Sequence, residues 1–408
     1  MKAIVLAAGE GVRMHPLTYT RPKALLQVAG KPLIWHVLSR LKIAGITEVC
    51  VVVKYKKEMI IDYLKENDLG IKISFIEQGQ KHGTGAALLD AEKSADSDFL
   101  MVAADNVCEP EFYKKVIEQH TPGGKTIALM KVENPERFGV AKVENSIISE
   151  FVEKPQKHFS NLANISVYCF SPSIFEELKS LKPTSRGEYE LVDVFVGAKA
   201  VEVEGFWMDA GYPWHLFELN QKLLEESEAS VEKIENSSIN GKIIMEEGAQ
   251  IIDSRIEGIA YIGKNSKIGP HAYLRGFVSI GEDCNIGEST TIKDSIIFNK
   301  VNAKHLSYIG DSVVGEDVNF GAGTQIANYR FDASHINVLT GKGWVNSARK
   351  KLGAIIGDGV KFGVLACTMP GKTIGNGCWI GSNVNVTRNI KPKTKVFAKQ
   401  DYVYSEGE

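Results

Sequence analysis

The sequence predicts two domains of different fold: a Rossmann-like α/β domain over residues 1–225 and a left-handed parallel β-helix over residues 236–408. Three observations predict this division. The chain has 408 residues, which is too long for one ordinary hydrophobic core. Its first half alternates short apolar runs with segments of helical periodicity, whereas its second half repeats an aliphatic residue at every sixth position.

Four apolar runs in the first half are expected to form buried strands of a parallel sheet: residues 2–8, 48–55, 72–78 and 98–105. Residues 33–45 and 57–67 carry helical spacing between them, and residues 213–230 read as a helix that ends the domain. Strands separated by helices indicate a sheet covered on both faces, with ligands at the carboxyl ends of the strands.

From about residue 236 the period changes to six. The aliphatic positions are Ile262, Ile268, Leu274, Ile280, Ile286 and Ile292, then Ile356, Phe362, Ile374, Ile380 and Val386, with Thr368 in the remaining slot. Glycine follows many of them directly. This period is typical of a triangular β-coil, in which each flat side sends one side chain inward and each corner needs a small residue. The phase breaks at 293–308 and 329–355, where we expect inserted loops on a functional face.

Composition narrows the class of protein. Hydrophobic residues make up 44% and charged residues 24% of the chain, and the net charge is −2. This balance is that of a globular protein and argues against nucleic acid or a membrane surface as the main partner. The N-terminus lacks the features of a signal peptide, and no segment reaches the roughly 18 apolar residues of a membrane helix. The six cysteines are scattered, so we expect reduced thiols in a cytoplasmic protein.

A glycine-containing loop follows the first predicted strand. Gly9 and Gly11 allow backbone N–H groups to approach a phosphate, but Met14 stands where a dinucleotide fingerprint needs its third glycine. Downstream come Arg13, then PLT (16–18), RPKALL (21–26) and GKP (30–32). This stretch resembles the signature loop of the sugar-1-phosphate nucleotidylyltransferases.

Further segments resemble the same family in chain order: EQGQKHGTG (77–85), AAD (103–105), FGV (138–140), EKP (153–155), NISVY (164–168) and WMDAG (207–211). Ser166 stands where relatives often have glycine, and the last segment resembles the thymidylyltransferase branch. The resemblance implies catalytic roles for Arg13 and Lys23, and metal binding by Asp105 and Asp209. It implies nucleotide binding by Leu6, Ala8, Gly9, Gly11, Gln78, Gly83 and Thr84, and sugar-phosphate binding by Gly139, Glu153, Lys154 and Asn164.

The chemistry of the family accounts for these residue types. A sugar-phosphate oxygen attacks the α-phosphorus of a nucleotide, which brings two anions together. Two carboxylates suit Mg²⁺, because this ion prefers oxygen ligands and leaves room for phosphates. Arg13 and Lys23 would hold the departing pyrophosphate, and Lys154 the incoming phosphate.

The second half contains KHLSYIGD (304–311), NFGAGT (319–324) and ANY (327–329). They resemble the acetyltransferase domain of the bacterial bifunctional enzyme that acetylates glucosamine 1-phosphate and then uridylylates the product, and RFD (330–332) resembles its archaeal members. The resemblance implies that His305 is the general base, because imidazole titrates near neutral pH. It implies acceptor binding by Tyr308, Asn319, Asn328 and Lys351, and acetyl-CoA binding by Ala322, Tyr329 and Ser382.

Together these resemblances imply a bifunctional enzyme that uses acetyl-CoA to acetylate glucosamine 1-phosphate, or galactosamine 1-phosphate, and then transfers a nucleotide from UTP or dTTP with Mg²⁺. UDP-N-acetylglucosamine is the expected product, and relatives assemble as trimers. Two alternatives remain open. One is a glucose-1-phosphate thymidylyl- or uridylyltransferase with a non-catalytic solenoid. The other is a non-enzymatic scaffold subunit of the same architecture, which would be expected to have lost the charged set at positions 13, 23, 105 and 209.

Overall fold

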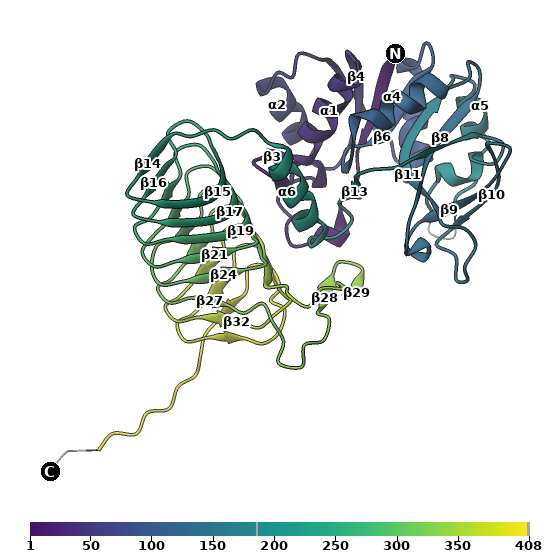
Figure 1. Cartoon of the computed structure of the whole chain (residues 1–408). Coiled ribbons are helices and arrows are strands. Elements are labelled where there is room, and N and C mark those ends of the chain that lie inside the picture. The colour runs from purple at the N-terminus through teal and green to yellow at the C-terminus, as the bar shows by residue number, and fades with distance from the viewer. Residues whose placement is uncertain (185–186, 406–408) are drawn as a thin grey trace. The chain divides into compact units, whose positions relative to one another are not determined.

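The computed structural model describes residues 1–184 and 187–405, which form two compact units (Figure 1). The first unit contains Met1–Glu10, Arg21–Leu26 and Pro32–Ala210. The second contains Gly11–Thr20, Gln27–Lys31 and the chain from Gly211 onward. The glycine-containing loop after the first strand is therefore divided between the two units.

The first unit is built on a twisted sheet whose first half is parallel. The four predicted strands are β1 (Lys2–Ala7), β4 (Glu48–Val53), β5 (Lys72–Glu77) and β6 (Phe99–Ala103), hydrogen-bonded in the order β5-β4-β1-β6. All three pairings are parallel. β1, β4 and β6 are buried as expected, whereas β5 is an edge strand with alternately exposed residues. The prediction that residues 72–78 are buried is wrong because no further strand of the described chain covers that edge.

The rest of this sheet is mixed, which the sequence reading did not anticipate. It comprises β8 (Lys125–Lys131), β9 (Gly139–Glu144), β10 (Ile147–Glu153), β11 (Leu162–Phe170) and β12 (Lys199–Val203). β11 runs antiparallel to both β6 and β8. Asn145 and Ser146 both have positive φ at the turn between β9 and β10. Such a turn joins antiparallel strands directly, so no crossover helix is needed.

The remaining elements of this half are short. The helices are α1 (Leu33–Ile43), α2 (Lys57–Glu66), α3 (Thr84–Asp90), α4 (Pro110–Gln119) and α5 (Ile174–Lys179), and 3-10 turns occur at Val12–Met14, Lys23–Leu25, Glu92–Ser94, Pro135–Arg137 and Leu191–Val194. The short strands are β2 (Gln27–Val28), β3 (Lys31–Pro32), β7 (Asn106–Cys108) and β13 (Trp207–Asp209). β7 pairs with β13, which joins two segments far apart in the sequence.

The second unit is a left-handed parallel β-helix with three faces, as predicted (Figure 1). One face contains β14 (Lys233–Glu235), β16 (Gln250–Ile252), β18 (Lys267–Ile268), β20 (Asn285–Ile286), β23 (Asn302–Ala303), β26 (Asn319–Phe320), β31 (Lys361–Phe362), β34 (Trp379–Ile380) and β36 (Lys395–Val396). The next contains β21 (Thr291–Lys293), β24 (Tyr308–Gly310), β27 (Gln325–Ile326), β32 (Cys367–Thr368) and β35 (Asn385–Val386). The third contains β22 (Ile296–Ile297), β25 (Val313–Val314), β30 (Ala354–Ile356) and β33 (Lys372–Ile374).

In the first coils, three longer strands run through from the second face to the third: β15 (Ser238–Met245), β17 (Arg255–Ile262) and β19 (Tyr273–Ile280). Every residue of the predicted six-residue series is buried, including Thr368. A Cβ atom on Gly263 would lie 2.5 Å from the carbonyl carbon of Gly281 in the next coil. The corner glycines are therefore required by the close approach of successive coils.

The first phase break is not an insertion. Ile262 pairs with Ile280 in the next coil, Ile280 pairs in turn with Ile297, and Ile297 with Val314. The stretch from Ile280 to Ile297 is one residue shorter than the stretch from Ile262 to Ile280. The stretch from Ile297 to Val314 is shorter by the same amount. The coil loses one residue at the same corner in two successive turns, so residues 293–308 stay within the solenoid and the expected loop is absent there.

The second phase break is a true insertion. Val314 pairs with Ile356, so this turn of the coil uses more than twice the usual length of chain. The inserted chain contains a hairpin of β28 (Asn337–Thr340) and β29 (Gly343–Asn346). It returns to the coil where the backbone N–H of Leu352 donates to the carbonyl of Asn328 at 2.9 Å.

Helix α6 (His215–Glu226) is shorter than the predicted 213–230 and packs on the solenoid. Its buried Asn220 donates to the carbonyl of Phe277 and accepts from the Ser279 hydroxyl at 2.6 Å. All six cysteines lie in the described ranges and are free thiols. Among the described residues, no helix has the length and apolar character needed to cross a membrane.

Candidate functional sites

One ammonium group meets two carboxylates at the carboxyl edge of the first unit's parallel strands. Lys23 lies on a 3-10 turn, Asp105 follows β6, and Asp209 ends β13. The Lys23 ammonium bonds Asp105 and lies 3.7 Å from Oδ1 of Asp209. The Ala210 N–H donates to the Asp105 carbonyl, which holds β13 against the end of β6. The structure thus brings together three residues that are far apart in the chain.

The charge on Asp105 is stabilised by this arrangement. Burial alone would raise the pKa of its carboxyl, but the Lys23 ammonium outweighs that effect and holds the pKa below its usual value. Both carboxylates contact the same cation, so they are close enough to share a divalent ion. Two carboxylates leave most positions of an octahedral Mg²⁺ open for water and phosphate oxygens, which fits the ion's preference.

Two neighbours had no expected role, although Trp207 begins the WMDAG segment. The buried amide of Asn106 donates to the carbonyl of Ile165 at 2.8 Å and accepts from Nε1 of Trp207 at 2.5 Å. It therefore ties β7 to β11 and β13. Trp207 also lies 5.1 Å from Phe138, ring centre to ring centre. Asn106 directly follows Asp105, and this adjacency to a strand-end carboxylate was the available signal.

The expected sugar-phosphate residues occupy three neighbouring strands. Gly139 of β9 pairs with Glu153 of β10, and a Cβ atom on Gly139 would lie 2.5 Å from the Glu153 carboxylate. Lys154, with positive φ, places its ammonium 3.6 Å from that carboxylate. Asn164 of β11 donates to the Tyr168 hydroxyl and accepts from the backbone of Ser166. Ser166 has φ 56°, in the left-handed region that glycine adopts most readily.

The expected nucleotide residues cluster by strand. Leu6 lies near the end of β1 and its carbonyl accepts from Ala104, while Ala8 and Gly9 follow the strand. Gln78 follows β5 and donates to the carbonyl of Lys81. Gly83 caps α3, where a Cβ atom would lie 2.2 Å from the Tyr189 carbonyl, and the Thr84 hydroxyl accepts from Leu191. Leu6 lies within β1 and the others lie beyond β1 or β5, and the carboxyl ends of these two strands lie at one edge of the sheet.

Arg13 and Gly11 belong to the segment Gly11–Thr20 of the second unit. Gly11 has φ 70° at the start of the 3-10 turn Val12–Met14. The Arg13 guanidinium lies 5.7 Å from the centre of the Tyr212 ring. Arg13 is therefore held by an aromatic face of its own unit.

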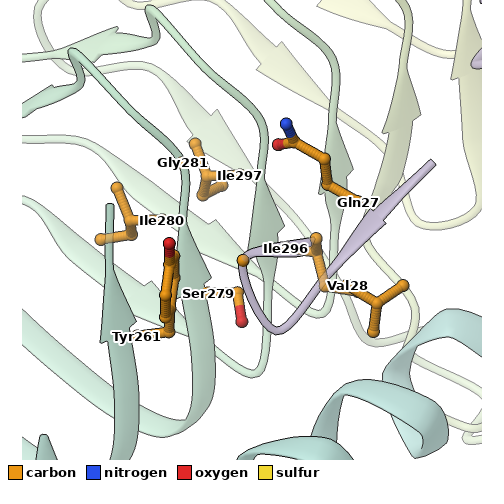
Figure 2. A pocket seen from close by; sticks show the side chains of 9 residues that line it. Gln27, Val28, Tyr261, Ser279, Ile280, Gly281, Ile296 and Ile297 are labelled. Carbon is orange, nitrogen blue, oxygen red and sulfur yellow. The ribbon is translucent and has the colours of Figure 1, made fainter. Parts of the chain in front are cut away.

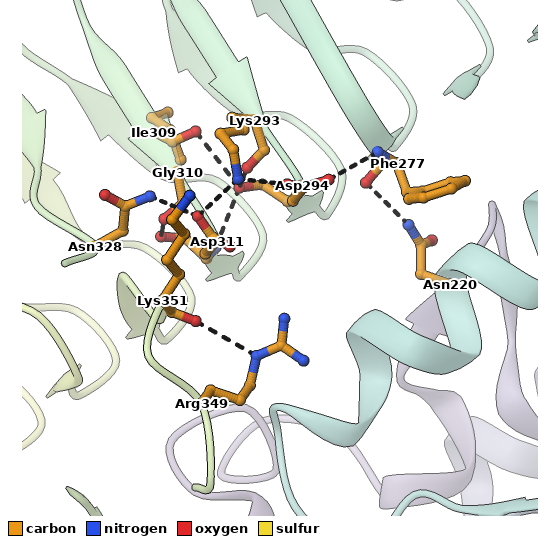
Figure 3. Close-up of polar contacts among 12 residues, drawn as sticks. Asn220, Phe277, Lys293, Asp294, Ile309, Gly310, Asp311, Asn328, Arg349 and Lys351 are labelled. Atoms are coloured by element: carbon orange, nitrogen blue, oxygen red, sulfur yellow. Dashed lines mark hydrogen bonds and ion pairs between the residues drawn. The ribbon is translucent and has the colours of Figure 1, made fainter. Parts of the chain in front are cut away.

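A polar cluster occupies one corner of the solenoid, after β21 and β24 (Figure 3). Its members are Tyr308 and Asn328, which were expected to bind the acceptor, together with Lys293, Asp294 and Asp311. The amide of Asn328 donates to the Tyr308 hydroxyl at 3.1 Å and to Asp311 at 2.5 Å. The Lys293 ammonium bonds Asp294 and lies 3.2 Å from Oδ2 of Asp311. We call this group the corner cluster.

The corner cluster is largely shielded from water. The side chains of Lys293 and Asp311 are 15% and 4% exposed. Burial acts to lower the pKa of the Lys293 ammonium, but the bond to Asp294 and the charge of Asp311 raise it above its usual value. No role was expected for Lys293, nor for Asp311, the last residue of the KHLSYIGD segment. Asp311 lies one coil beyond Asp294 and one coil before Asn328, and this spacing is a signal only once the coil length is known.

His305 lies at a different corner, between β23 and β24, and its side chain is 56% exposed. Nδ1 of His305 is 3.3 Å from a carboxylate oxygen of Glu288, which occupies the same corner one coil earlier. Glu288 was also missed. A carboxylate at this distance orients the imidazole and favours the tautomer with its proton on Nδ1.

The other expected acetyl-transfer residues are distributed around the same coils. Ala322 stands one coil beyond His305, and the N–H of Gly323 donates to the His305 carbonyl. Ser382 lies at this corner two coils further on, where it leaves no room for a side chain at Gly363. Asn319 begins β26, and Tyr329 bridges to Lys351 at the base of the insertion. Asn319, Tyr329 and Lys351 are all exposed. Tyr329 directly follows Asn328 of the corner cluster, whereas Asn319 lies on another face of the coil.

A small cavity in the second unit is too small and too tightly packed to be a ligand site. It lies between β2 and the coil and has a volume of about 10 Å³, with Val28, Tyr261, Ser279 and Ile296 among its lining residues (Figure 2). This is room for one water molecule at most. A Cβ atom on Gly30 would overlap the Tyr261 ring at 2.1 Å, so the contact is tight packing rather than a ligand site.

Known proteins resemble the chain over each half and over the whole. The nucleotidyl transferase family profile matches residues 2–226, and the GMPPB C-terminal domain profile matches residues 256–364. A bifunctional protein GlmU from Methanocaldococcus jannaschii is 39% identical over 415 residues, covering 99% of each chain. A bifunctional sugar-1-phosphate nucleotidylyltransferase/acetyltransferase from Sulfurisphaera tokodaii is 39% identical over 405 residues, covering 96% of this chain and 98% of its own. A solved structure from Bacillus anthracis, described as a putative glucose-1-phosphate thymidylyltransferase, is 28% identical with a TM-score of 0.50, covering 57% of this chain and 98% of its own.

Proposed function

Because the chain belongs to the nucleotidyl transferase family and, over its full length, to the bifunctional sugar-1-phosphate nucleotidylyltransferase/acetyltransferases, we propose specific substrates for its two activities. The second unit acetylates glucosamine 1-phosphate with acetyl-CoA. The first unit then transfers a nucleotide from UTP to the product, giving UDP-N-acetylglucosamine and pyrophosphate. The chain is an enzyme of amino-sugar nucleotide biosynthesis.

The observation that carries the nucleotidyl assignment is the shared contact of Asp105 and Asp209 with one cation. Asp105 and Asp209 would hold Mg²⁺, which would neutralise charge on the nucleotide phosphates. Lys23 stabilises the departing pyrophosphate, and Lys154 and Glu153 hold the sugar phosphate and its hydroxyls. Gln78, Gly83 and Thr84 contact the base, and Leu6, Ala8, Gly9 and Gly11 line the nucleotide. No strong base is required, because the attacking phosphate oxygen is already anionic.

The acetyl-transfer assignment is supported by the corner cluster and by the His305–Glu288 pair. A sugar phosphate needs a cation and hydrogen-bonding groups, and Lys293, Tyr308 and Asn328 supply both. His305, oriented by Glu288, accepts a proton from the substrate ammonium so that the free amine can attack the thioester. Attack forms the carbon–nitrogen bond, the tetrahedral intermediate then breaks its carbon–sulfur bond, and the departing thiolate of coenzyme A takes up the second proton released by the nitrogen. Ala322, Tyr329 and Ser382 are proposed to contact acetyl-CoA, and Asn319 and Lys351 the acceptor.

We also propose that the chain acts as a trimer that shares the acetyl-CoA site. Leu306 and Leu365 are 62% and 59% exposed at the corner that carries His305. Exposed apolar ridges of this kind are usually covered by a partner. A second copy of the chain would cover this ridge and close the site beside Ala322.

A second candidate is a thymidylyltransferase acting on glucose 1-phosphate. The match to the Bacillus anthracis structure, which covers 57% of this chain, favours it. A product assay separates the two: glucose, glucosamine, galactosamine and N-acetylglucosamine 1-phosphates are each incubated with UTP or dTTP, with and without acetyl-CoA. UDP-N-acetylglucosamine formed from glucosamine 1-phosphate only when acetyl-CoA is present supports the bifunctional proposal. No thiol release with either amino sugar would refute acetyl transfer.

A further inference from the structure

The hairpin β28–β29 is a rigid projection of the solenoid. At its base, Ile336 donates through its N–H to the carbonyl of Arg349 at 2.9 Å, and its own carbonyl accepts from the buried Ser347 hydroxyl at 2.7 Å. Ile336 and Val338 are buried, and Ile336 fills the space that a side chain at Gly371 would need. Thr340 closes the tip by donating to the carbonyl of Gly343. These hydrogen bonds and buried side chains hold the hairpin at its base and its tip, so it resists displacement.

The tip of this hairpin packs against the loop that carries Arg13. Both belong to the second unit. A Cβ atom on Gly341 would lie 2.3 Å from the Val12 carbonyl oxygen, 2.5 Å from a Val12 methyl and 2.9 Å from Nδ1 of His15. Gly341 does not have positive φ, in contrast to Gly343. The absence of a side chain at Gly341 is therefore demanded by the neighbouring loop and not by its own backbone.

The far end of the same loop is fixed to a corner of the coil. The Thr20 hydroxyl donates to Oδ2 of Asp358 at 2.5 Å. Oδ1 of Asp358 accepts from the backbone of Glu316 at 2.7 Å, so this carboxylate is itself held by the preceding coil. The loop from Gly11 to Thr20 thus has two supports on the solenoid, one at each end.

Between these supports the loop is internally braced. The Thr18 hydroxyl donates to the carbonyl of Gly11 at 2.9 Å, and the ring of His15 stacks on Tyr19 with centres 3.9 Å apart. Met14 and Leu17 are completely buried. A displacement imposed at Val12 is therefore passed to its neighbour Arg13 rather than absorbed by the chain.

We propose that the inserted hairpin is a positioning element for nucleotidyl transfer: its tip at Gly341 holds Val12 and His15, and thereby sets the orientation of Arg13 toward pyrophosphate. The inference rests on the proposed function, because Arg13 matters here only if its loop binds the nucleotide phosphates. It assigns to the acetyltransferase insertion a task in the other reaction. The same insertion carries Tyr329 and Lys351 at its base, so one element serves both activities.

Substitution of Gly341 by alanine tests the proposal in the full-length enzyme. The new methyl group must move the Val12 backbone by about 1 Å to reach ordinary contact, and a misplacement of this size commonly costs up to about 10²-fold in rate. We expect kcat/KM for UTP to fall roughly 10- to 10²-fold. In the reverse reaction, KM for pyrophosphate should rise more than KM for the sugar nucleotide. Acetyl transfer and the unfolding temperature should match those of Lys342→Ala, the control at the adjacent tip residue.

A second variant, Thr20→Val, removes the hydroxyl at the other support without adding bulk. It should shift KM for pyrophosphate in the same direction by a smaller factor, even if Gly341→Ala were to fold poorly. If both variants fold and KM for pyrophosphate is unchanged in both, the proposal is overturned. If Gly341→Ala does not fold, an unchanged KM for pyrophosphate in Thr20→Val alone overturns it. If the unmutated enzyme transfers no nucleotide with any substrate pair, the proposed function itself is wrong, which is a distinct result.

Discussion

Replacement of Lys293 by methionine separates structural from functional roles in the corner cluster. The substitution keeps the length of the side chain and removes its charge. Asp311, only 4% exposed, then loses its cation and keeps a single amide partner in Asn328. Removing one member of a buried ion pair typically costs about 3–5 kcal/mol, because the remaining charge is left without compensation. Since Asn328 still donates to Asp311, we expect a loss near the lower end, about 3 kcal/mol.

The double variant Lys293→Met/Asp311→Asn removes both buried charges. Replacing a buried ion pair by neutral groups of similar size is often close to neutral, so the unfolding free energy should return to within about 1 kcal/mol of the unmutated value. Asp294 also loses its cation, but it is partly exposed and still accepts from the Phe277 N–H at 3.1 Å, so this loss should cost little. Denaturant unfolding of both variants measures this difference.

Acetyl transfer gives the functional half of the test. If the Lys293 ammonium binds the acceptor phosphate, the double variant should regain stability without regaining substrate affinity. A hydrogen bond to a charged group is worth about 1.5–3 kcal/mol, which corresponds to a rise in KM for glucosamine 1-phosphate of roughly 10- to 10²-fold. The assay is thiol release from acetyl-CoA. Normal KM in the refolded double variant would show that Lys293 is structural and would refute the assignment of the cluster to the acceptor.

Three further predictions concern the separate sites and the assembly. Asp105→Ala and Asp209→Ala should each abolish Mg²⁺-dependent nucleotidyl transfer and leave acetyl transfer intact; normal turnover of either variant would contradict the metal assignment. His305→Ala should lower the rate of acetyl transfer by roughly 10²- to 10⁴-fold. Glu288→Gln should lower it by a smaller factor, because Glu288 acts through His305. An inactive Glu288→Gln variant beside a fully active His305→Ala variant would show that Glu288, and not His305, is the general base. Light scattering should report a trimer or a multiple of three, and a monomer at micromolar concentration would remove the shared acetyl-CoA site.

The sequence predicted the solenoid well because its signal is repeated. Ile262, Ile268 and Leu274 each report the same packing environment, so the period stands out against local variation. The mixed half of the nucleotide sheet has no such redundancy. β9 and β10 are joined by a tight turn at Asn145 and Ser146, and their pairing with β11 depends on contacts between distant segments. The sequence therefore predicted the parallel strands and missed the antiparallel ones.

The candidate sites divide in a similar way. Lys23, Asp105 and Asp209 occur in separate motifs, so each could be chosen from sequence before the structure placed them together. Glu288 belongs to no motif of this kind, and Asp311, although it ends the KHLSYIGD segment, has no role implied by it. Their neighbours are set by the stacking of coils, which places residues one full turn apart next to each other. The register of these contacts follows only if residues 293–308 continue the coil, whereas the phase break in the sequence predicts a loop there.

The missing residue of the shorter coils explains why the corner cluster forms where it does. In the longer coil, β19 runs through the corner at Gly276, where a Cβ atom would overlap the Asp294 carboxylate of the next coil. In the two shorter coils the chain turns more sharply, through Asp294 and Asp311 with φ near 43° and 48°. Aspartate is one of the few residues other than glycine that adopts this conformation readily. Loss of one residue thus favours residues that tolerate positive φ at the same corner in successive coils, and the two carboxylates stacked there are balanced by the Lys293 ammonium. The phase break at residues 293–308 therefore coincides with the corner cluster because the shortened coils place charged residues at one corner, and not because a loop projects there.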